Sequence, residues 1–408
     1  MKKIAGILIG TALLCGVGGV SALPNNAFGL VQANAATYES LNEGESVIES
    51  AAEGLQTRAK SAYLMEYATG SVLYAQNETA HLPIASMCKI MTLLLAFDAL
   101  DAGVISLDEE IIVSERAASM GGSQVFLEAN AKYPVRELIK SIVVCSANDS
   151  CVAMAERIAG SESLFVEKMN EKAKAIGAND TLFANCTGLP KEPQYSCAKD
   201  AAIMLKNLLS HKEYFEYGKV WMDKFSHPKG RYTEITNTNK LVRFYDGCDG
   251  GKTGFTNEAG FCLAATAKRE NMRVISVVIG EKTSANRFED TRTLFDYAFA
   301  NYTVTPVVEG AIPLEKQAVV VGGKTKSVTV APSRTASVFS KRGEKSGVTM
   351  EFNFNKLKAP VKQGETAGEL VLFKDGIEID RVGLIACESV EKANFLYRLK
   401  EFARNWNA

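Results

Sequence analysis

The stretch Ser86-Met-Cys-Lys89-Ile-Met-Thr-Leu-Leu-Leu-Ala-Phe-Asp-Ala-Leu100 predicts a buried helix that begins with a serine and a lysine three residues apart. Apolar residues recur through it at helical spacing, at Ile90, Leu93, Leu94, Phe97 and Leu100. Residues three apart on a helix share a face, so the Lys89 amine can lie beside the Ser86 hydroxyl. Ser86 is expected in the first helical turn, where free N–H groups and the helix dipole favour developing negative charge.

This serine and lysine suit nucleophilic catalysis. A serine hydroxyl is a weak nucleophile at neutral pH and needs a base that removes its proton during attack. A lysine becomes such a base when burial and a second cation lower its pKa, and Lys252 is the candidate for that cation. The sequence therefore predicts Ser86 as the nucleophile and Lys89 as its base, without a histidine.

A second motif, Ser146-Ala-Asn148, interrupts two apolar-periodic segments. Helices are predicted over 135–144 and 149–158, which places Ser146 and Asn148 in the turn between them. A hydroxyl in such a turn can relay a proton to a leaving amine. The amide of Asn148 can hold a substrate amide.

A third motif, Lys252-Thr-Gly254, lies in a glycine-dense stretch that precedes predicted strands over 261–267 and 273–279. A glycine at position 254 would let a substrate backbone lie close against an edge strand. Lys252 and Thr253 would then face a negatively charged end of the substrate. Together the three motifs indicate acyl transfer on a substrate with a free carboxylate.

Length and composition bound the remaining classes of function. The chain has 408 residues, which suits two domains, and 47% of them are hydrophobic. Its net charge of −1, without a basic stripe interleaved with aromatics, argues against nucleic acid as a partner. The three histidines lack metal-ligand spacing, which argues against a zinc peptidase and a Ser-His-Asp triad. We expect no metal and no cofactor.

The N-terminus predicts export. Lys2 and Lys3 precede an apolar stretch, and Ala33-Asn-Ala35 offers a cleavage site, so residues 1–35 are predicted as a signal peptide. A retained membrane anchor is the alternative, because the apolar run is long. Either way the protein acts outside the cytoplasm, at the outer face of the membrane or in the cell wall. Its eight remaining cysteines lie mostly in apolar runs or beside motif residues, and we expect buried, reduced thiols there.

The chain divides by composition into four further segments. A lead-in over 36–56 precedes an α+β catalytic domain over 57–302, with helices and a mainly antiparallel sheet. Residues 303–387 alternate valine with polar residues around the hairpin signal Lys374-Asp-Gly376 and predict a small all-β domain. Residues 388–408 predict an amphipathic helix, which either associates with a membrane surface or docks onto the β domain through its apolar stripe.

The motifs, with Gly121-Gly-Ser123, Asn185-x-x-Gly188-Leu189 and Asp249-Gly-Gly-Lys-Thr-Gly-Phe-Thr256, resemble the low-molecular-mass penicillin-binding proteins. More narrowly, the chain resembles the serine-type D-alanyl-D-alanine carboxypeptidases. The resemblance covers most of the chain and implies a β-lactamase/transpeptidase-like catalytic domain. The sequence departs from the family where Ala147 replaces a common glycine and where Cys186-Thr187 replaces a common Pro-His.

The resemblance also implies a role for each motif residue. Ser86 would form the acyl-enzyme, Lys89 would accept its proton, and Ser146 would protonate the departing D-alanine. The residues implied in substrate binding are Asn148, Lys252, Thr253, Gly254, Phe255 and Arg287. The N–H groups of Ser86 and Phe255 would form the oxyanion hole.

The implied partners are the stem pentapeptide of peptidoglycan and the β-lactam antibiotics that acylate the same serine. Two other functions use similar motifs: a β-lactamase, and a catalytically silent module that binds cell wall or senses β-lactams. The additional β domain and C-terminal helix argue against a β-lactamase. The presence of every motif residue argues against a silent module.

Overall fold

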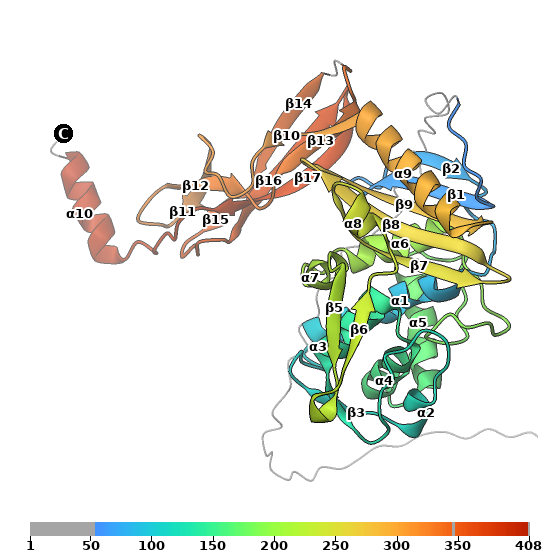
Figure 1. Cartoon of the computed structure of the whole chain (residues 1–408). Helices are drawn as coiled ribbons and strands as arrows, with labels where there is room; N and C mark the ends of the chain where they lie inside the picture. Colours follow the sequence, from blue (N-terminus) through green and yellow to red (C-terminus); the bar gives the residue numbers. More distant parts are fainter. Residues whose placement is uncertain (1–53, 345–346, 407–408) are drawn as a thin grey trace, which may run out of the picture. The chain divides into compact units, whose positions relative to one another are not determined.

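The computed structural model describes residues 54–344 and 347–406 (Figure 1). Its architecture is α+β, as expected: a sheet with helices, then a β-rich domain, then a helix at the C-terminus. The predicted signal peptide over 1–35 and nearly all of the predicted lead-in over 36–56 lie outside the described residues.

A five-stranded antiparallel sheet forms the centre of the catalytic domain, with strand order β2-β1-β9-β8-β7. The strands are β1 (Ser61–Glu66), β2 (Val72–Gln76), β7 (Cys248–Thr256), β8 (Gly260–Arg269) and β9 (Met272–Glu281). The predicted strands over 261–267 and 273–279 are therefore confirmed as parts of β8 and β9. Strand β7 carries Lys252-Thr-Gly254 and is an edge strand, so one side of its backbone has no sheet partner among the described residues.

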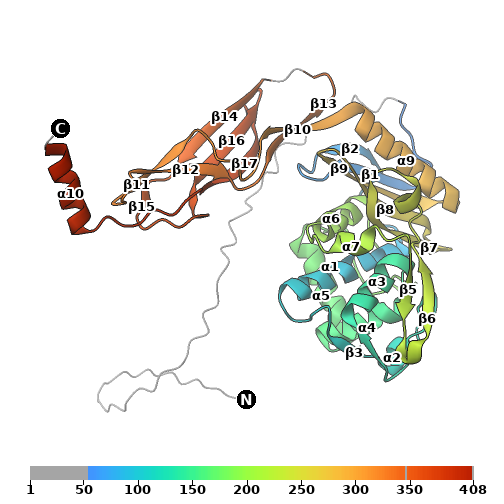
Figure 2. The same cartoon turned by 60° about the vertical axis from the view of Figure 1, so that its left-hand side comes forward.

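The two faces of this sheet pack against different cores, because side chains alternate along a strand. Ala264 and Val277 belong to the larger core, which also contains the apolar side chains of the helical region. Leu263 and Val278 point the other way and belong to the core that also contains side chains of helix α9 (Ser284–Asn301). Figure 2 shows α9 lying along this sheet. The sheet thus separates α9 from the larger core, and α8 is the helix of the helical region that packs on the α9 side.

The helical region follows β2 in the chain and precedes β7. Its elements are η1 (Ala85–Cys88), α1 (Lys89–Asp101), β3 (Glu110–Ile112), α2 (Glu115–Ala118), β4 (Lys132–Pro134), α3 (Val135–Cys145), α4 (Asn148–Ala159), α5 (Glu162–Ala175), α6 (Ala198–Leu208), α7 (Tyr214–Gly218), β5 (Met222–Ser226), η2 (Pro228–Gly230), β6 (Tyr232–Thr236) and α8 (Leu241–Phe244). Helix α1 contacts α3, α4, α5 and α6, which explains why nine of its 13 residues are buried.

Two local predictions need correction here. Ser86 lies in the 3₁₀ turn η1 just before α1, and not in the first turn of the α-helix itself. Asn148 is the first residue of α4, and not part of the preceding turn. In both places the chain turns sharply through a non-glycine residue with positive φ, 47° at Ala85 and 66° at Ser146. Periodicity alone does not reveal such turns.

The β-rich domain has a six-stranded sheet of order β14-β16-β17-β12-β11-β15 and a two-stranded sheet of β10 and β13. Its strands are β10 (Tyr302–Val308), β11 (Gln317–Val321), β12 (Ser327–Pro332), β13 (Ala336–Lys341), β14 (Val348–Phe354), β15 (Leu357–Lys358), β16 (Thr366–Lys374) and β17 (Ile377–Ala386). The predicted hairpin joins β16 to β17. Its turn residues, Asp375 and Gly376, have φ of 51° and 81°, as a type I′ turn requires.

The C-terminal helix α10 spans Phe395–Trp406, so the predicted start at residue 388 is wrong. The residues before it pair as isolated bridges, Val390 with Val361 and Lys392 with Gly323, because their backbone extends the β-rich domain. Phe395, Leu396 and Leu399 of the apolar stripe are 77%, 67% and 55% exposed. These three side chains are therefore accessible, and membrane association and docking both stay predictions for this helix.

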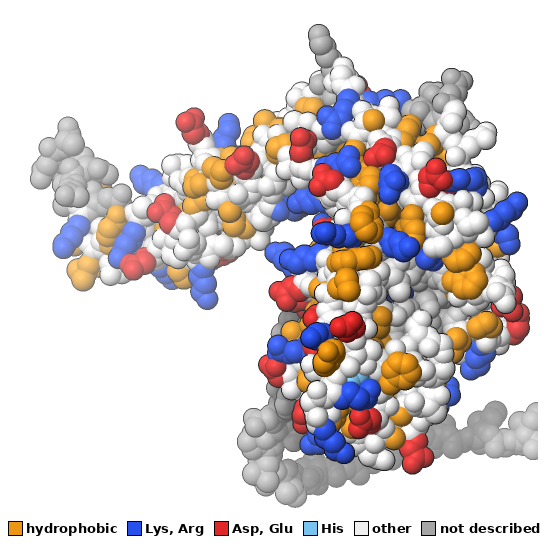
Figure 3. Space-filling model, in the orientation of Figure 1, with side chains coloured by type: hydrophobic (Ala, Val, Ile, Leu, Met, Phe, Trp, Pro, Cys, Tyr) orange, Lys and Arg blue, Asp and Glu red, His pale blue; other side chains and the backbone are white. Residues whose placement is uncertain are grey.

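Surface and thiol chemistry agree with the composition. Charges of both signs are interspersed over the face drawn in Figure 3. Within the residues that the structure describes, no helix is both long enough and apolar enough to span a bilayer. Of the eight cysteines that follow the predicted signal peptide, all free in the structure, six are buried, and Cys145 and Cys387 are partly exposed.

Candidate active site

Ser86 and Lys89 meet at the junction of η1 and α1. Lys89 Nζ lies 3.0 Å from Ser86 Oγ and donates a second hydrogen bond, of 2.5 Å, to the carbonyl oxygen of Thr187. The Lys89 side chain is fully buried, whereas Ser86 is partly exposed. The expected contact between amine and alcohol is therefore present. The left-handed residue Ala85 precedes the serine, and such a strained conformation is typical of functional turns.

The loop that supplies the Thr187 carbonyl packs directly on the backbone of the nucleophile. Asn185 Oδ1 accepts hydrogen bonds from the N–H groups of Thr187 (3.0 Å) and Gly188 (2.7 Å), which fixes the loop. A Cβ atom at Gly188 would lie 2.0 Å from the Ala85 carbonyl oxygen, so only glycine fits. The sequence analysis assigned no role to these three residues. An asparagine followed three residues later by glycine was the available signal for this turn.

Ser146 and Asn148 lie where α3 ends and α4 begins. Ser146 is 3% exposed, and its Oγ has no hydrogen-bond partner within the described part of the chain. Asn148 Nδ2 donates to the Gly121 carbonyl oxygen at 2.7 Å, whereas its Oδ1 is buried without a partner there. A buried oxygen without a donor is costly unless a ligand supplies one. Both atoms can therefore bind substrate.

The third motif is held by the fold from two sides. Lys252 is 1% exposed, and its Nζ donates a hydrogen bond of 3.1 Å to the carbonyl oxygen of Thr253. Thr253 Oγ1 donates to Thr238 Oγ1 at 2.8 Å. A Cβ atom at Gly254 would lie 2.5 Å from the Ile84 carbonyl oxygen. Glycine is thus required because β7 approaches the segment before the nucleophile, a reason that the sequence analysis did not foresee.

Both buried lysines have lowered pKa values, and the charge of Lys89 contributes to the shift of Lys252. Burial lowers the pKa of Lys89, and burial together with the Lys89 charge lowers the pKa of Lys252 well below its ordinary value. Burial raises the pKa of Cys88 and Cys151 nearby to about 12, so these thiols stay neutral and offer no compensating charge. The site therefore favours an uncharged amine beside the serine, and the cause is burial of Lys89.

Arg287 reaches the motif from α9, on the far face of the sheet from Ser86. Its Nη1 donates to the Gly254 carbonyl oxygen at 3.1 Å, and its Nε is buried without a partner among the described residues. Burial lowers the pKa of Arg287 to about 10. Phe255 follows Gly254 on β7 and stacks on Phe261, with ring centroids 4.2 Å apart. The structure thus gathers Arg287 and Phe255 around β7.

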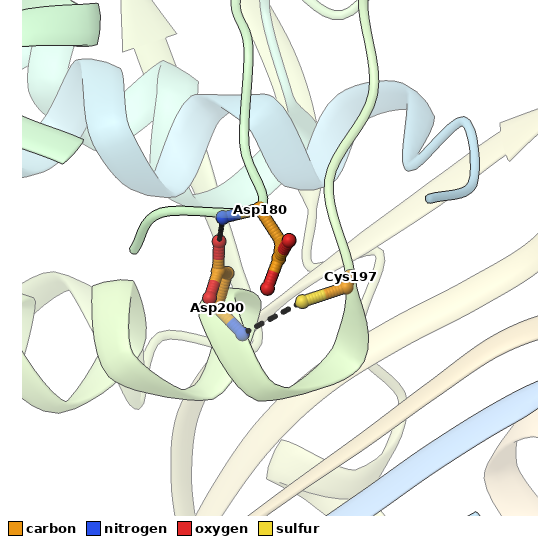
Figure 4. Close-up of side chains that lie close together, drawn as sticks. All are labelled: Asp180, Cys197 and Asp200. Carbon is orange, nitrogen blue, oxygen red and sulfur yellow. Dashed lines mark hydrogen bonds between the residues drawn. The ribbon is translucent and has the colours of Figure 1, made fainter. Parts of the chain in front are cut away.

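One group of potential metal ligands lies away from these residues: Asp180, Cys197 and Asp200 (Figure 4). Asp200 Oδ2 accepts from the Asp180 N–H at 2.7 Å, and Cys197 Sγ accepts from the Asp200 N–H at 3.4 Å. These bonds close the start of α6 onto the preceding loop, with Cys197 as the N-cap. Their close approach is therefore explained by the fold, without an ion.

Sequence comparison assigns the family. Residues 47–283 match the Peptidase S11 family, D-alanyl-D-alanine carboxypeptidase. Residues 302–392 match the C-terminal domain of penicillin-binding protein 5. This chain belongs to the D-alanyl-D-alanine carboxypeptidase family. It is a serine-type carboxypeptidase of the low-molecular-mass penicillin-binding group, with a transpeptidase-like catalytic domain and a C-terminal β-rich domain.

Named relatives extend over nearly the whole carboxypeptidase. D-alanyl-D-alanine carboxypeptidase DacF of Bacillus subtilis is 42% identical over 357 residues, 86% of this chain and 91% of that protein. DacC of Escherichia coli is 34% identical over 364 residues, 87% of this chain and 90% of that protein. The crystal structure of penicillin-binding protein 5 from Haemophilus influenzae has a TM-score of 0.64 at 30% identity and covers 83% of this chain and 98% of its own. Penicillin-binding protein D2 of Listeria monocytogenes, solved in a cefotaxime-bound form, has a TM-score of 0.54 at 32% identity and covers 60% of this chain and 98% of its own.

Proposed function

We propose that this carboxypeptidase removes the terminal D-alanine from peptidoglycan stem pentapeptides through an acyl-enzyme on Ser86. The observation that carries the proposal is the 3.0 Å contact between Ser86 Oγ and the fully buried amine of Lys89. A nucleophile within hydrogen-bond reach of a base is what covalent acyl transfer requires.

The proposed reaction has two steps. Neutral Lys89 takes the hydroxyl proton as Ser86 Oγ attacks the carbonyl carbon between the two D-alanines, and the N–H groups of Ser86 and Phe255 stabilise the oxyanion. The bond to the leaving nitrogen then breaks, and the proton on Lys89 passes through the Ser146 hydroxyl to that amine, which leaves Lys89 neutral again and Ser146 protonated. Water then attacks the resulting ester and gives a proton to neutral Lys89, and Lys89 passes that proton to Ser86 Oγ as the shortened peptide leaves.

Substrate binding uses the open edge of β7. A peptide laid along an edge strand gains main-chain hydrogen bonds, and Gly254 keeps β7 close to the nucleophile segment. Asn148 Oδ1, buried without a partner in the described residues, would accept a substrate N–H. Lys252, Thr253 and Arg287 supply positive charge and a hydroxyl for the terminal carboxylate.

A β-lactam would acylate Ser86 in the same way, because its strained amide occupies the position of the scissile bond. The similar protein from Listeria monocytogenes was solved with cefotaxime and with ampicillin bound. In this enzyme the acyl group would clear slowly, since the site is built for a peptide leaving group.

Mass spectrometry after penicillin treatment tests the proposal. Ser86→Ala should lose the adduct and at least about 10³-fold of D-alanine release, because no other group replaces the nucleophile. Ser163→Ala, an exposed serine on α5, is the matched control and should behave as wild type. An adduct on another serine would contradict the assignment. Rapid hydrolysis of many equivalents of penicillin would favour a β-lactamase, and drug binding without D-alanine release would favour a silent module.

We further propose that the catalytic domain spans 57–302, that the β-rich domain begins at 303, and that the enzyme is exported to the outer face of the membrane. The exposure of Phe395, Leu396 and Leu399 supports association of α10 with a membrane surface. Co-sedimentation of the full chain with vesicles of mixed neutral and anionic lipid tests this. A double variant, Leu396→Ser with Leu399→Ser, should stay in the supernatant, and unchanged binding would refute the role of α10.

A further inference from the structure

The 121–127 loop, between α2 and β4, lies against the second catalytic motif. It forms no helix or strand. The carbonyl oxygen of Gly121 accepts the side-chain N–H of Asn148 at 2.7 Å, and the carbonyl oxygen of Ser123 accepts the backbone N–H of Asn148, also at 2.7 Å. The position of this loop therefore fixes the Asn148 amide, whose Oδ1 is the atom without a partner among the described residues.

A buried carboxylate holds the loop from the side of α4. Asp149 is 0% exposed, and its Oδ2 accepts the backbone N–H groups of Val125 and Leu127, both at 3.1 Å. Its Oδ1 accepts the N–H of Ser150 at 2.9 Å. Burial raises the pKa of Asp149, and these hydrogen bonds oppose the rise because they favour the charged form. Asp149 forms no ion pair in the part of the chain that the structure describes, so backbone N–H groups stabilise its charge.

The loop is strained at the residue between these two N–H groups. Phe126 has a φ of 63°, and its side chain is 56% exposed. This left-handed conformation is unfavourable for a bulky residue, and it persists where the surrounding structure imposes it. Burial of the ring does not explain the strain, whereas the carboxylate does, because the conformation turns the N–H groups on both sides toward one anion. Arg231 Nη2 donates to the Phe126 carbonyl at 2.9 Å and holds the loop from outside.

The loop also leaves the Asn148 amide little room. Gly122 lies between the two residues whose carbonyls hold Asn148, and its φ is 79°. A Cβ atom at Gly122 would lie 2.8 Å from Asn148 Nδ2, closer than side-chain carbons approach a neighbour without displacing it. A small displacement of the loop is therefore a displacement of the amide.

We propose that Asp149 is a positioning residue for the reaction: its carboxylate fixes the 121–127 loop, and the loop orients the Asn148 amide toward the substrate. The inference rests on the proposed function, in which Asn148 Oδ1 accepts a substrate N–H. An amide in place of the Asp149 carboxylate presents an NH₂ group where the loop needs an acceptor. The loop then shifts, Asn148 loses the Gly121 carbonyl, and the substrate meets an amide that is free to rotate.

A double-mutant cycle in the full-length enzyme tests the coupling. The measured quantity is kcat/KM for D-alanine release from diacetyl-Lys-D-Ala-D-Ala. Asp149→Asn should lower kcat/KM about tenfold in the wild-type background and less than about twofold in Asn148→Ala, because both changes remove the same substrate contact. Effects that multiply would overturn the inference and leave the proposed function intact. Wild-type kcat/KM in Asn148→Ala would overturn the role of Asn148 in the proposed function, and this inference with it.

Asp200→Asn is the matched control. Asp200 is 2% exposed, and its Oδ2 accepts the Asp180 N–H at 2.7 Å, so it also holds a loop through a buried carboxylate. Asp200→Asn and Asp149→Asn should both lower the urea midpoint. The effect of Asp200→Asn on kcat/KM should be small and equal with and without the Asn148 amide. A tenfold loss that disappears in Asn148→Ala would show that loosening any loop gives the result, and the inference would fail.

Two further measurements address the loop directly. Hydrogen exchange read by mass spectrometry should be faster over 121–128 in Asp149→Asn, and unchanged exchange there would refute the proposed contact. Gly122→Ala, with Asp149 in place, should also lower kcat/KM only when Asn148 is present; wild-type kcat/KM would sever the link between loop and amide. If Asp149→Asn does not fold, Asp149→Ser, whose hydroxyl still accepts one N–H, replaces it in the cycle with the same expected coupling.

Discussion

The two domains of this carboxypeptidase differ in what they bury. Every described polar or charged side chain that is buried belongs to the catalytic domain, from Ser61 to Thr291, and among them are Lys89 and Lys252. The β-rich domain has a core of valine, leucine and alanine side chains. Its charges form surface ion pairs, such as Arg334 with Asp380 and Arg381 with Glu378.

This difference separates a domain shaped by chemistry from one shaped by packing. A buried amine without a carboxylate partner costs folding free energy, and groups with strongly shifted pKa values gather at functional sites. The catalytic domain therefore tolerates unfavourable burial that the β-rich domain does not contain. If this is right, substitutions in the two domains should separate activity from stability.

The largest effect is expected from Lys89→Met, which keeps the length of the side chain and removes its base. Acylation of Ser86 by a fluorescent penicillin should slow by about 10³-fold, in the range typical of a lost general base. The free energy of unfolding should stay equal or rise, because an apolar chain replaces a buried, unpaired amine. Stopped-flow fluorescence and urea unfolding give the two quantities.

Lys168→Met is the matched control, at an exposed position on α5. It should change neither the rate of acylation nor the urea midpoint. Acylation of Lys89→Met at normal speed would show that another group removes the proton from Ser86. A strong loss of stability in Lys89→Met would show that this lysine serves the fold, and the contrast between the two domains would fail.

The opposite behaviour is expected from Leu370→Ala in β16, a fully buried position of the β-rich core. The cavity should destabilise that domain by about 2–5 kcal/mol while the acylation rate stays at the wild-type value. Hydrogen exchange read by mass spectrometry, in peptides that cover β16 and β17, measures the local loss. Ile377→Ala, an aliphatic position that is 71% exposed, is the control and should change exchange little. Slower acylation in Leu370→Ala would show that the β-rich domain supports the active site.

Much of this fold was predictable from local patterns. The β16–β17 hairpin follows from Asp375-Gly376 between alternating strands, and α1 follows from its apolar spacing. The start of α10 was not predictable, because residues 388–394 have a composition compatible with a helix. Their backbone instead pairs with distant segments, as Val390 does with Val361. Such tertiary pairing is invisible to a local pattern.

The site was predictable to a different degree. Ser86 and Lys89 lie three residues apart, so their contact follows from helical geometry. In the structure Lys89 Nζ donates a hydrogen bond of 3.0 Å to Ser86 Oγ. The second partner of Lys89, the Thr187 carbonyl, comes from a loop about a hundred residues away and is a backbone atom. Side-chain identity does not encode such an acceptor. For the same reason the sequence suggested only the substrate as the reason for Gly254, whereas the structure adds the nearby Ile84 carbonyl.

A further effect is expected in the pH dependence of acylation. Because burial lowers the pKa of Lys89 from its ordinary 10.5, the neutral amine forms at lower pH than in water. The acylation rate should rise about tenfold per pH unit below that pKa and then level off. The free energy of unfolding should also rise with pH, because the folded state binds fewer protons than the unfolded state between the lowered pKa and 10.5. Stability from this group therefore increases as the pH rises through that window.

A second buried group titrates with the opposite sign and provides the control. Burial, and then the neighbouring Asp290, raise the pKa of Glu281 from 4.5 to about 8. The folded state holds this proton between those values, so Glu281 makes the protein less stable as the pH rises from 4.5 to 8. Glu281→Gln should remove that loss of stability and leave the pH profile of acylation unchanged. A flat acylation profile in Glu281→Gln would mean that the carboxyl group, and not Lys89, controls the reaction. The folding free energy lost by burying the Lys89 amine would then not be explained by a role in catalysis.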